Sequence, residues 1–299
     1  MSSSSNIPVI GQVLNEQNQS HETRKKLITQ LEGEIGRTVI TLFTSFRFPV
    51  VLSDDDADML EAILQKLNLS KGIALLLSSP GGSGLAAERI INICRKYSGT
   101  NDYWVIVPGK AKSAATMVGF GASKIFMGPA SELGPIDPQL TIIEDGRPKR
   151  FSLCNVVDSY NQLFADATKV KGNLQPYLQQ LARYDSREIK EYEDAISLSG
   201  DIAVKALKTG MMSSLSDAEI KKKIAVFLTP KETKAHGRLI DRDKATSCGL
   251  AVDRVNIDSK TWKLSYELFV RLNHFVSNQV AKCIESSQHS YVTTAGRTE

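Results

Sequence analysis

The stretch Ile73-Ala74-Leu75-Leu76-Leu77-Ser78-Ser79-Pro80-Gly81-Gly82 decides the fold, because five apolar residues lead directly into a proline–glycine turn. A short, continuously apolar run is typical of a strand in a parallel sheet, where both faces are buried. The serine, proline and glycine residues after it predict a tight turn. Two successive glycines also let a ligand approach the main chain closely. The stretch therefore predicts a buried parallel strand that ends at a candidate binding turn.

Strand and helix patterns alternate on both sides of this stretch. Apolar or β-branched runs predict strands, and residues with helical spacing of their apolar positions predict helices between them. This alternation predicts an α/β fold, a stacked βαβ core followed by a helical C-terminal half. Ligands of such sheets bind outside the carboxyl ends of the strands, where the loops 78–84 and 108–114 compete for the site. The strands are expected at 38–43, 73–77, 103–107 and 124–127, and the helices at 21–35, 54–69, 85–97 and 113–121.

The C-terminal half has the patterns of several helices. Residues 151–228 predict helices with breaks at 171–173 and at Gly210, and a strand is expected at 250–255. A long final helix is expected from about 258 to 286, with a loose end after it. Its apolar face suits either a subunit contact or the protein's own core. The expected organisation is a disordered lead-in (1–20), a catalytic domain (21–255) and a C-terminal helix and tail (256–299).

Composition excludes several classes of protein. The 299 residues are 41% hydrophobic and 23% charged, which is typical of a globular chain. The longest apolar stretch falls short of a membrane helix, and the serine-rich start has no features of a signal peptide. The net charge of +4 is scattered, so no nucleic-acid partner is expected. Four separated cysteines predict reduced thiols and a cytoplasmic protein. The four histidines lack metal-ligand spacing, so no metal is expected. The sequence has no lysine motif for pyridoxal phosphate, and no other cofactor is expected.

Ser113 is the candidate nucleophile. It follows a strand and a Pro-Gly turn and precedes the helical pattern that begins at Ala114. A hydroxyl at a helix N-terminus lies in a positive field, beside backbone amides that have no intrahelical acceptor. The same position also suits a serine that only caps the helix. The position by itself leaves both interpretations open.

Three segments of the sequence together carry a resemblance to a known family. They are Leu75–Gly82, the run Ala111-Lys112-Ser113-Ala114-Ala115-Thr116, and the run Leu133-Gly134-Pro135-Ile136-Asp137-Pro138-Gln139. In order and spacing they resemble the serine dehydrogenase proteinase family, which shares the ClpP/crotonase fold with the Clp proteolytic subunit and signal peptide peptidase A. The resemblance covers about residues 38–140 and resumes around 236–252. It implies a serine peptidase that cleaves peptide bonds through an acyl-enzyme.

The resemblance also implies roles for individual residues. Ser113 matches the nucleophile, and the amides of Gly81, with Gly82 beside it, and of Ala114 match the oxyanion hole. The general base departs from the Clp proteolytic subunit, because the segment that holds its histidine contains Asp137 here and no histidine. His236 lies where that relative has its aspartate. The two roles are therefore exchanged in the first hypothesis, with His236 as the base and Asp137 orienting it.

A serine–lysine dyad, as in signal peptide peptidase A, is the second hypothesis for the base. Lys149, Lys169 and Lys171 follow Ser113 at comparable separations. A buried lysine can lose its proton near neutral pH and act as a base.

Two other functions remain open at this stage. One is a crotonase-like acyl-thioester enzyme, which shares the paired-amide hole, and the other is a non-catalytic scaffold of the same fold. The peptidase interpretation implies peptide or unfolded-protein substrates in the cytosol, a homo-oligomer, and possible delivery by an unfoldase or another partner.

Overall fold

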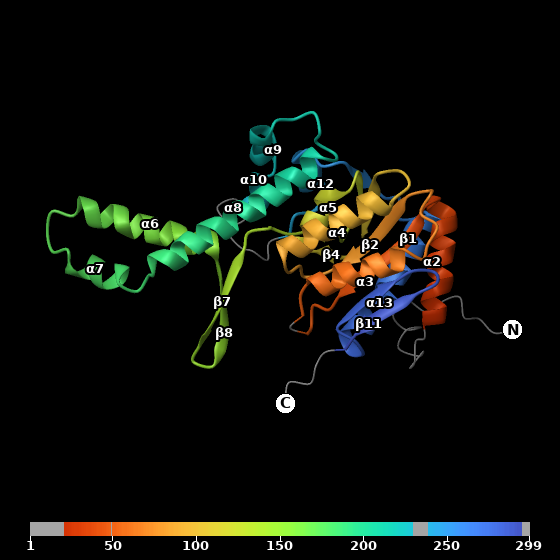
Figure 1. Ribbon diagram of the computed structural model, residues 1–299, viewed down its shortest axis with the longest axis horizontal. Coiled ribbons are helices and arrows are strands. Elements are labelled where there is room, and N and C mark those ends of the chain that lie inside the picture. The colour runs from red at the N-terminus through yellow and green to blue at the C-terminus, as the bar shows by residue number, and fades with distance from the viewer. Residues whose placement is uncertain (1–20, 49, 230–238, 295–299) are drawn as a thin grey trace.

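A seven-stranded sheet forms the centre of the computed structural model, which describes residues 21–48, 50–229 and 239–294 (Figure 1). The strand order is β11-β10-β1-β2-β3-β5-β9. Five of these strands run parallel, and the two C-terminal strands join antiparallel at the β1 edge. They are β1 (Thr38–Thr44), β2 (Ile73–Ser78), β3 (Tyr103–Val107), β5 (Lys124–Met127), β9 (Val252–Arg254), β10 (Lys282–Glu285) and β11 (Ser290–Thr293).

Helices cover both faces of the sheet. One face packs against α3 (Asp54–Leu64), α4 (Gly84–Tyr97) and α5 (Ala114–Gly121), and the other against α2 (His21–Ile35) and α13 (Lys260–Asn278). Every residue of β2 is buried, as its unbroken apolar run requires. The apolar face of α13 lies against α2 and the sheet of the same chain, which decides between the two interpretations of the final helix. Its buried members are Leu264, Leu268, Leu272 and Phe275.

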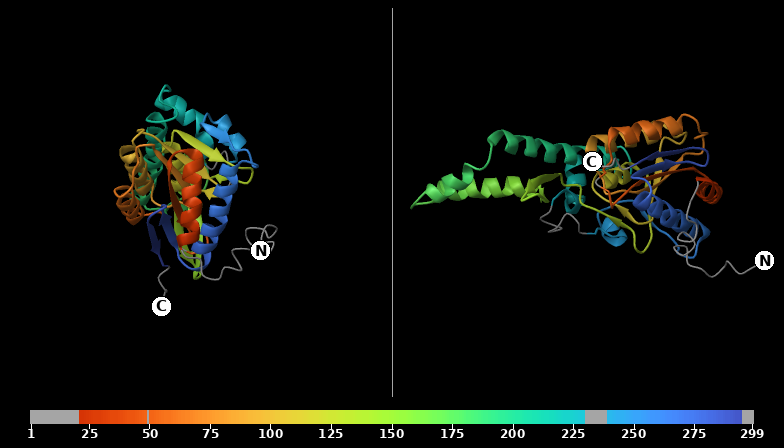
Figure 2. Two further views of the ribbon diagram at one scale, coloured as in Figure 1. Left: turned by 90° about the vertical axis from the view of Figure 1, so that its right-hand side faces the viewer. Right: turned by 90° about the horizontal axis from the view of Figure 1, so that it is seen from below.

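Short elements and a helical projection complete the described chain. Two short strands, β4 (Lys110–Ala111) and β6 (Glu132–Leu133), pair beside the sheet, and β7 (Gln139–Glu144) and β8 (Arg147–Ser152) form an exposed hairpin. The helices α6, α7 and the first part of α8 project from the body as an arm (Figures 1 and 2). The remaining helices are α6 (Leu153–Lys169), α7 (Gln175–Leu181), α8 (Ser186–Lys208), α9 (Asp217–Lys223), α10 (Ala225–Leu228) and α12 (Arg242–Ser247).

The predicted α/β fold class is confirmed. The helix at 21–35 and the strands at 103–107 and 124–127 have the predicted bounds, and the other predicted elements up to residue 128 differ by a few residues at their ends. The C-terminal prediction was partly wrong, because the final helix ends at Asn278 and β10 and β11 follow it. The expected disordered lead-in lies outside the described residues.

Buried ion pairs explain why β10 did not have the pattern of a strand. Lys282 pairs with Asp56 at 2.8 Å, and Glu285 pairs with Arg24 at 2.7 Å. All four side chains are at least nine-tenths buried. Charged residues in a sequence normally indicate an exposed face, and only their partners in α2 and α3 make them compatible with an interior strand.

Candidate active site

The turn after β2 and the turn before α5 are in direct contact. Ser79 forms backbone hydrogen bonds with both neighbours of Ala111, accepting from the Lys112 amide and donating to the Lys110 carbonyl, each at 3.0 Å. Gly81 has a φ of +98°, and a Cβ placed on it would lie 2.5 Å from the Lys112 oxygen and 2.6 Å from the Ser113 Cβ. Only glycine fits there without moving the Ser113 backbone. The two loops that compete for the site in the sequence therefore form it together.

Ser113 has an unusual backbone conformation. Its φ of 51° and ψ of −121° lie in a region that non-glycine residues rarely adopt, and such strain concentrates at functional sites. Ser113 occupies the N-cap position of α5, yet its side chain forms no capping hydrogen bond. The structure thus removes the interpretation of Ser113 as a helix cap. Ser113 is a half-buried residue on a strained strand-to-helix turn, a geometry known from other serine nucleophiles.

The backbone amides around Ser113 differ in what they already bind. The Gly81 amide donates to the Ser79 hydroxyl at 3.1 Å. The bridge between Leu52 and Gly82 uses the Gly81 carbonyl and the Ser83 amide, so it does not use the Gly82 amide. Ala114 is the first residue of α5, and its amide has no acceptor within the helix. The geometry favours the amides of Gly82 and Ala114, rather than that of Gly81, as donors to a developing oxyanion.

Ser113 and Asp137 line the same cavity, which has a volume of about 470 Å³. The cavity opens beyond the carboxyl ends of β1 and β2, where parallel sheets bind ligands. Asp137 is 1% exposed. Apolar side chains, an arginine and two further serines also contribute to the walls, among them Phe46, Phe48, Met117, Arg150, Ser45 and Ser199.

Thr116 connects the segment that carries Ser113 with the loop that carries Asp137. Its fully buried hydroxyl lies 2.8 Å from the Ala111 carbonyl and 3.0 Å from the Gly134 carbonyl, and it accepts a hydrogen bond from the Gly134 amide at 3.1 Å. Lys112 adds a second connection by donating to the Leu133 carbonyl at 3.2 Å. The relative position of the two candidate site residues therefore depends on side chains that belong to neither.

Cys154 is the thiol nearest to this site. Burial and the nearby carboxylate of Asp137 raise the pKa of the Cys154 thiol. A thiol with a raised pKa is a poor nucleophile at neutral pH, so Cys154 does not compete with Ser113 for that role.

Comparison with known proteins identifies the family. Residues 11–274 match the family described as "ClpP-like SDH-type serine proteinase". The chain belongs to this family of serine peptidases. The family and the class of enzyme that the sequence resemblance implies are confirmed at that level.

Individual proteins that are similar to this chain share a third or less of their aligned residues with it. An uncharacterized protein of Methanocaldococcus jannaschii is 33% identical over 126 residues, which make up 39% of this chain and 43% of that protein. The chain thus matches less than half the length of this relative. Two solved structures of mutants of the 1510-N membrane-bound stomatin-specific protease are 14% and 17% identical. The first, in complex with a substrate peptide, has a TM-score of 0.32 and covers 73% of this chain and 93% of its own. The second has a TM-score of 0.29 and covers 69% and 93%.

The three candidate lysine bases of this serine proteinase do not line the cavity that contains Ser113. Lys149 is exposed on β8 and pairs with Glu144, whereas Lys169 and Lys171 are exposed at the outer end of the arm. None of the three is among the described residues that line the cavity. His236 lies outside the described residues.

Described residues that precede and follow His236 in the sequence lie beside the Asp137 loop. Before it, the Phe227 carbonyl accepts from the Ile136 amide at 2.7 Å. After it, Ile240 and Leu133 exchange two backbone hydrogen bonds of 2.9 and 3.1 Å.

Other features of the family member bear on its chemistry. Within residues 21–48, 50–229 and 239–294, no cluster of His, Cys, Asp and Glu side chains is arranged to hold a metal ion. In the same part of the chain, none of the helices combines the length and apolar character needed to span a bilayer.

The sequence did not predict that Thr116, Arg150 and Ser199 belong to the site. Thr116 stood in a short run of small residues, and nothing in the sequence places the other two near Ser113.

Proposed function

We propose that this protein hydrolyses peptide bonds through an acyl-enzyme on Ser113. The observation that carries the proposal is the strained Ser113 turn, whose hydroxyl makes no capping hydrogen bond and whose Cβ lies against Gly81. The Ser113 oxygen attacks the scissile carbonyl, and the amides of Gly82 and Ala114 stabilise the oxyanion that forms. Donors of this kind contribute about 3–4 kcal/mol each to stabilising the transition state.

For the base, we favour His236 oriented by Asp137. The support is that Asp137 shares the cavity with Ser113, and that Phe227 and Ile240, which precede and follow the segment of His236 in the sequence, are hydrogen-bonded to residues close to Asp137. The histidine takes the proton of the Ser113 hydroxyl during acylation and returns it to the leaving amine. A buried carboxylate would hold the ring in the required tautomer and stabilise the imidazolium. The exposed positions of Lys149, Lys169 and Lys171 give the lysine dyad less support.

The setting of the reaction is part of the same proposal. All four cysteines are free thiols, and Cys94, Cys248 and Cys283 are buried, which suits a reducing compartment such as the cytoplasm. The substrates would be peptides or unfolded segments that fit a cavity with apolar walls. We also propose a homo-oligomer, and a partner that delivers substrate is compatible with the open cavity.

Labelling with a fluorophosphonate probe tests the nucleophile and the base together. We expect labelling of the wild-type protein at Ser113, loss in Ser113→Ala, and strong weakening in His236→Ala and Asp137→Asn. Ser199→Ala is the matched control, because this serine lines the same cavity from α8, and His274→Ala on α13 is the control for the histidine.

Each other pattern identifies an alternative. Labelling that depends on Ser113 and on one of the three lysines, and not on His236, would establish the dyad. A folded protein that does not react with the probe but binds coenzyme A would indicate the acyl-thioester enzyme. A folded protein that does neither would indicate the scaffold.

A further inference from the structure

The arm formed by α6, α7 and the first part of α8 buries very little of its own surface. In α6 only Leu153 and Val157 are buried, α7 buries none of its residues, and α8 buries only Ile189 before Ile202. The arm projects away from the sheet in Figure 1 and in the right-hand view of Figure 2. Helices owe most of their stability to packing an apolar face against a partner. Large apolar side chains of the arm are 39–54% exposed instead, namely Phe164, Leu174, Leu178 and Leu198.

Charge on the arm is divided between two regions. We call residues 169–190 the tip, and residues 153–168 with 191–204 the shaft. The tip carries five basic and two acidic side chains, a net charge of +3, whereas the shaft carries six acidic side chains and no basic one, a net charge of −6. The tip's basic residues are Lys169, Lys171, Arg183, Arg187 and Lys190, and the shaft's acidic residues are Asp158, Asp166, Glu191, Glu193, Asp194 and Asp201.

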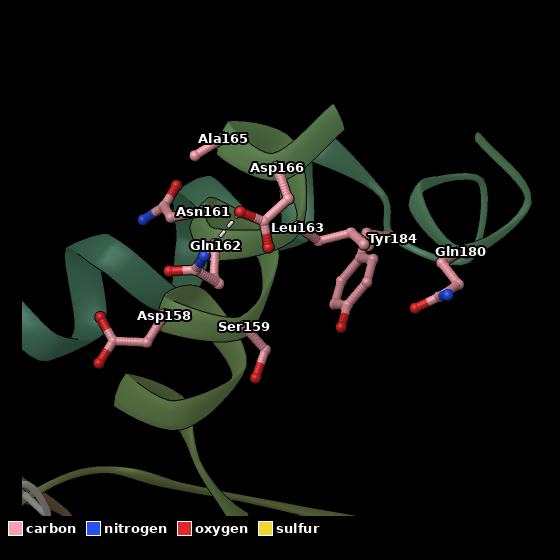
Figure 3. A pocket seen from close by; sticks show the side chains of 9 residues that line it. All are labelled: Asp158, Ser159, Asn161, Gln162, Leu163, Ala165, Asp166, Gln180 and Tyr184. Carbon is pink, nitrogen blue, oxygen red and sulfur yellow. Dashed lines mark hydrogen bonds between the residues drawn. The ribbon is translucent and has the colours of Figure 1, made fainter. Parts of the chain in front are cut away.

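Existing ion pairs do not remove this division. Lys190 pairs with Asp194 across the boundary, and Arg187 pairs with Asp185 within the tip. These pairs are exposed, and exposed pairs hold little free energy. A hollow of about 720 Å³ lies on the arm and is lined by the acidic side chains of Asp158 and Asp166 together with Leu163 and Tyr184 (Figure 3). The shaft therefore offers an acidic, partly apolar surface to whatever covers it.

We propose that a second copy of this chain covers the arm, in an antiparallel pair with the tip of each copy on the shaft of the other. The surface of the arm is basic at one end and acidic along the rest. A two-fold axis, the symmetry of most homodimers, brings the basic end of one copy onto the acidic part of the other, and the reverse. A partner of a single charge, such as a nucleic acid, would be attracted at one region and repelled at the other. The α6 shaft is about 25 Å long, enough for the tip of a partner to lie along it.

Charge reversal tests this arrangement in the full chain. The tip variant is Lys169→Glu, Lys171→Glu and Arg183→Glu, which changes the net charge of the tip from +3 to −3. The shaft variant is Asp166→Lys, Glu191→Lys, Glu193→Lys and Asp194→Lys, which changes the net charge of the shaft from −6 to +2. We expect the wild type to be dimeric or a higher even-numbered oligomer by analytical ultracentrifugation, and each variant alone to dissociate about tenfold or more readily, because like charges then meet at both ends. Circular dichroism checks that each variant keeps its helices.

Mixing the two variants gives the decisive result. In a mixed pair the acidic tip meets the basic shaft and the basic tip meets the acidic shaft, so heterodimers of the two variants are expected by native mass spectrometry. The control is Lys26→Glu, Lys66→Glu and Lys96→Glu, three exposed lysines of the body. Their reversal changes the net charge by −6, as in the tip variant, and should leave the mass of the assembly at the wild-type value. A monomeric wild type, variants that keep the oligomer, or a mixture that stays dissociated would each overturn the proposal. The test measures only the mass of the assembly, so its result does not depend on the reaction proposed for Ser113.

Discussion

Thr116 offers a direct test of how the fold positions the site. Replacing it by valine keeps the shape of the side chain and removes its hydroxyl. The Gly134 amide then loses its acceptor, and the carbonyls of Ala111 and Gly134 lose the one proton that the hydroxyl supplies. A buried polar group left without its partner costs about 1–3 kcal/mol. We therefore expect Thr116→Val to lower the free energy of unfolding by about 2–4 kcal/mol.

The expected change in melting temperature follows from the size of the protein. An unfolding entropy of about 2.1 cal/mol/K per residue amounts to roughly 0.6 kcal/mol/K for a chain of this length, so the melting temperature should fall by about 3–7 °C. The loop that carries Asp137 would also lose its position relative to Ser113. Displacements of about 1 Å can cost on the order of a hundredfold in rate, so fluorophosphonate labelling of Ser113 should slow by about ten- to a hundredfold.

Thr116→Ser separates the hydroxyl from the packing. Serine keeps the hydrogen-bonding group and loses only a methyl, so it should restore most of the labelling rate even where it costs some stability. If Thr116→Val labels at the wild-type rate well below its melting temperature, the hydroxyl does not position the site. If Thr116→Ser labels as slowly as the valine variant, packing rather than hydrogen bonding is responsible.

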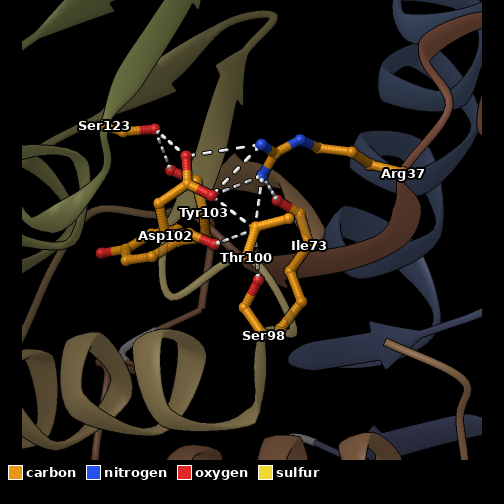
Figure 4. A network of polar contacts seen from close by, with 7 residues as sticks. All are labelled: Arg37, Ile73, Ser98, Thr100, Asp102, Tyr103 and Ser123. Carbon is orange, nitrogen blue, oxygen red and sulfur yellow. Dashed lines mark hydrogen bonds and ion pairs between the residues drawn. The ribbon is translucent and has the colours of Figure 1, made fainter. Parts of the chain in front are cut away.

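Three more predictions follow from single features. Gly81→Ala should abolish labelling of Ser113, because its Cβ would meet the Lys112 oxygen at 2.5 Å, whereas Gly146→Ala, at a similar positive φ in open space, should leave the labelling rate unchanged. A thiol reagent at pH 8 should modify Cys154 first, because it is part-exposed, and spare Cys94, whose pKa burial raises to about 12; rapid modification of Cys94 in the folded protein would contradict that burial. Burial tends to raise the pKa of Asp102, but hydrogen bonds from Ser123, Thr100 and Arg37 lower it overall (Figure 4). The stability from this lowered pKa is present above the ordinary value of 3.8 and is lost as the pH falls through the folded-state value, so Asp102→Asn should flatten the pH dependence of the melting temperature below about pH 4.

The strands and helices of the first half could be predicted because each carries its own local signal. The β2 strand is apolar throughout, and α3 begins with Ser53 and Asp56 in a reciprocal capping box. The β7–β8 hairpin had no such signal, because nearly all of its side chains are exposed or half-buried and no buried face requires an alternating apolar pattern. The C-terminal strand β10 was missed for the opposite reason, because its charges are buried with partners far away in the sequence.

The candidate site divides in the same way. Ser113, Gly81 and Gly82 could be found because a nucleophile on a turn and a glycine pair are local patterns. The positions of the candidate lysines could not be predicted. The hairpin and the arm that carry them are directed away from the cavity by tertiary packing, which the local sequence does not reveal. Thr116 acts through groups in β4 and in the Asp137 loop, and a residue in a helical run of small side chains gives no indication of such a role.

The sequence by itself thus determined the α/β class, the family resemblance and the two turns that could hold the chemistry, since these depend on neighbouring residues. Only the tertiary structure decided that Ser113 is strained and uncapped, which of the amides near it already has a hydrogen-bond acceptor, and which carboxylate shares its cavity. It also decided that the terminal helix packs on its own core while the arm stays uncovered. These properties depend on contacts between segments far apart in the chain, and the free energy of such contacts cannot be inferred from a local pattern of residues.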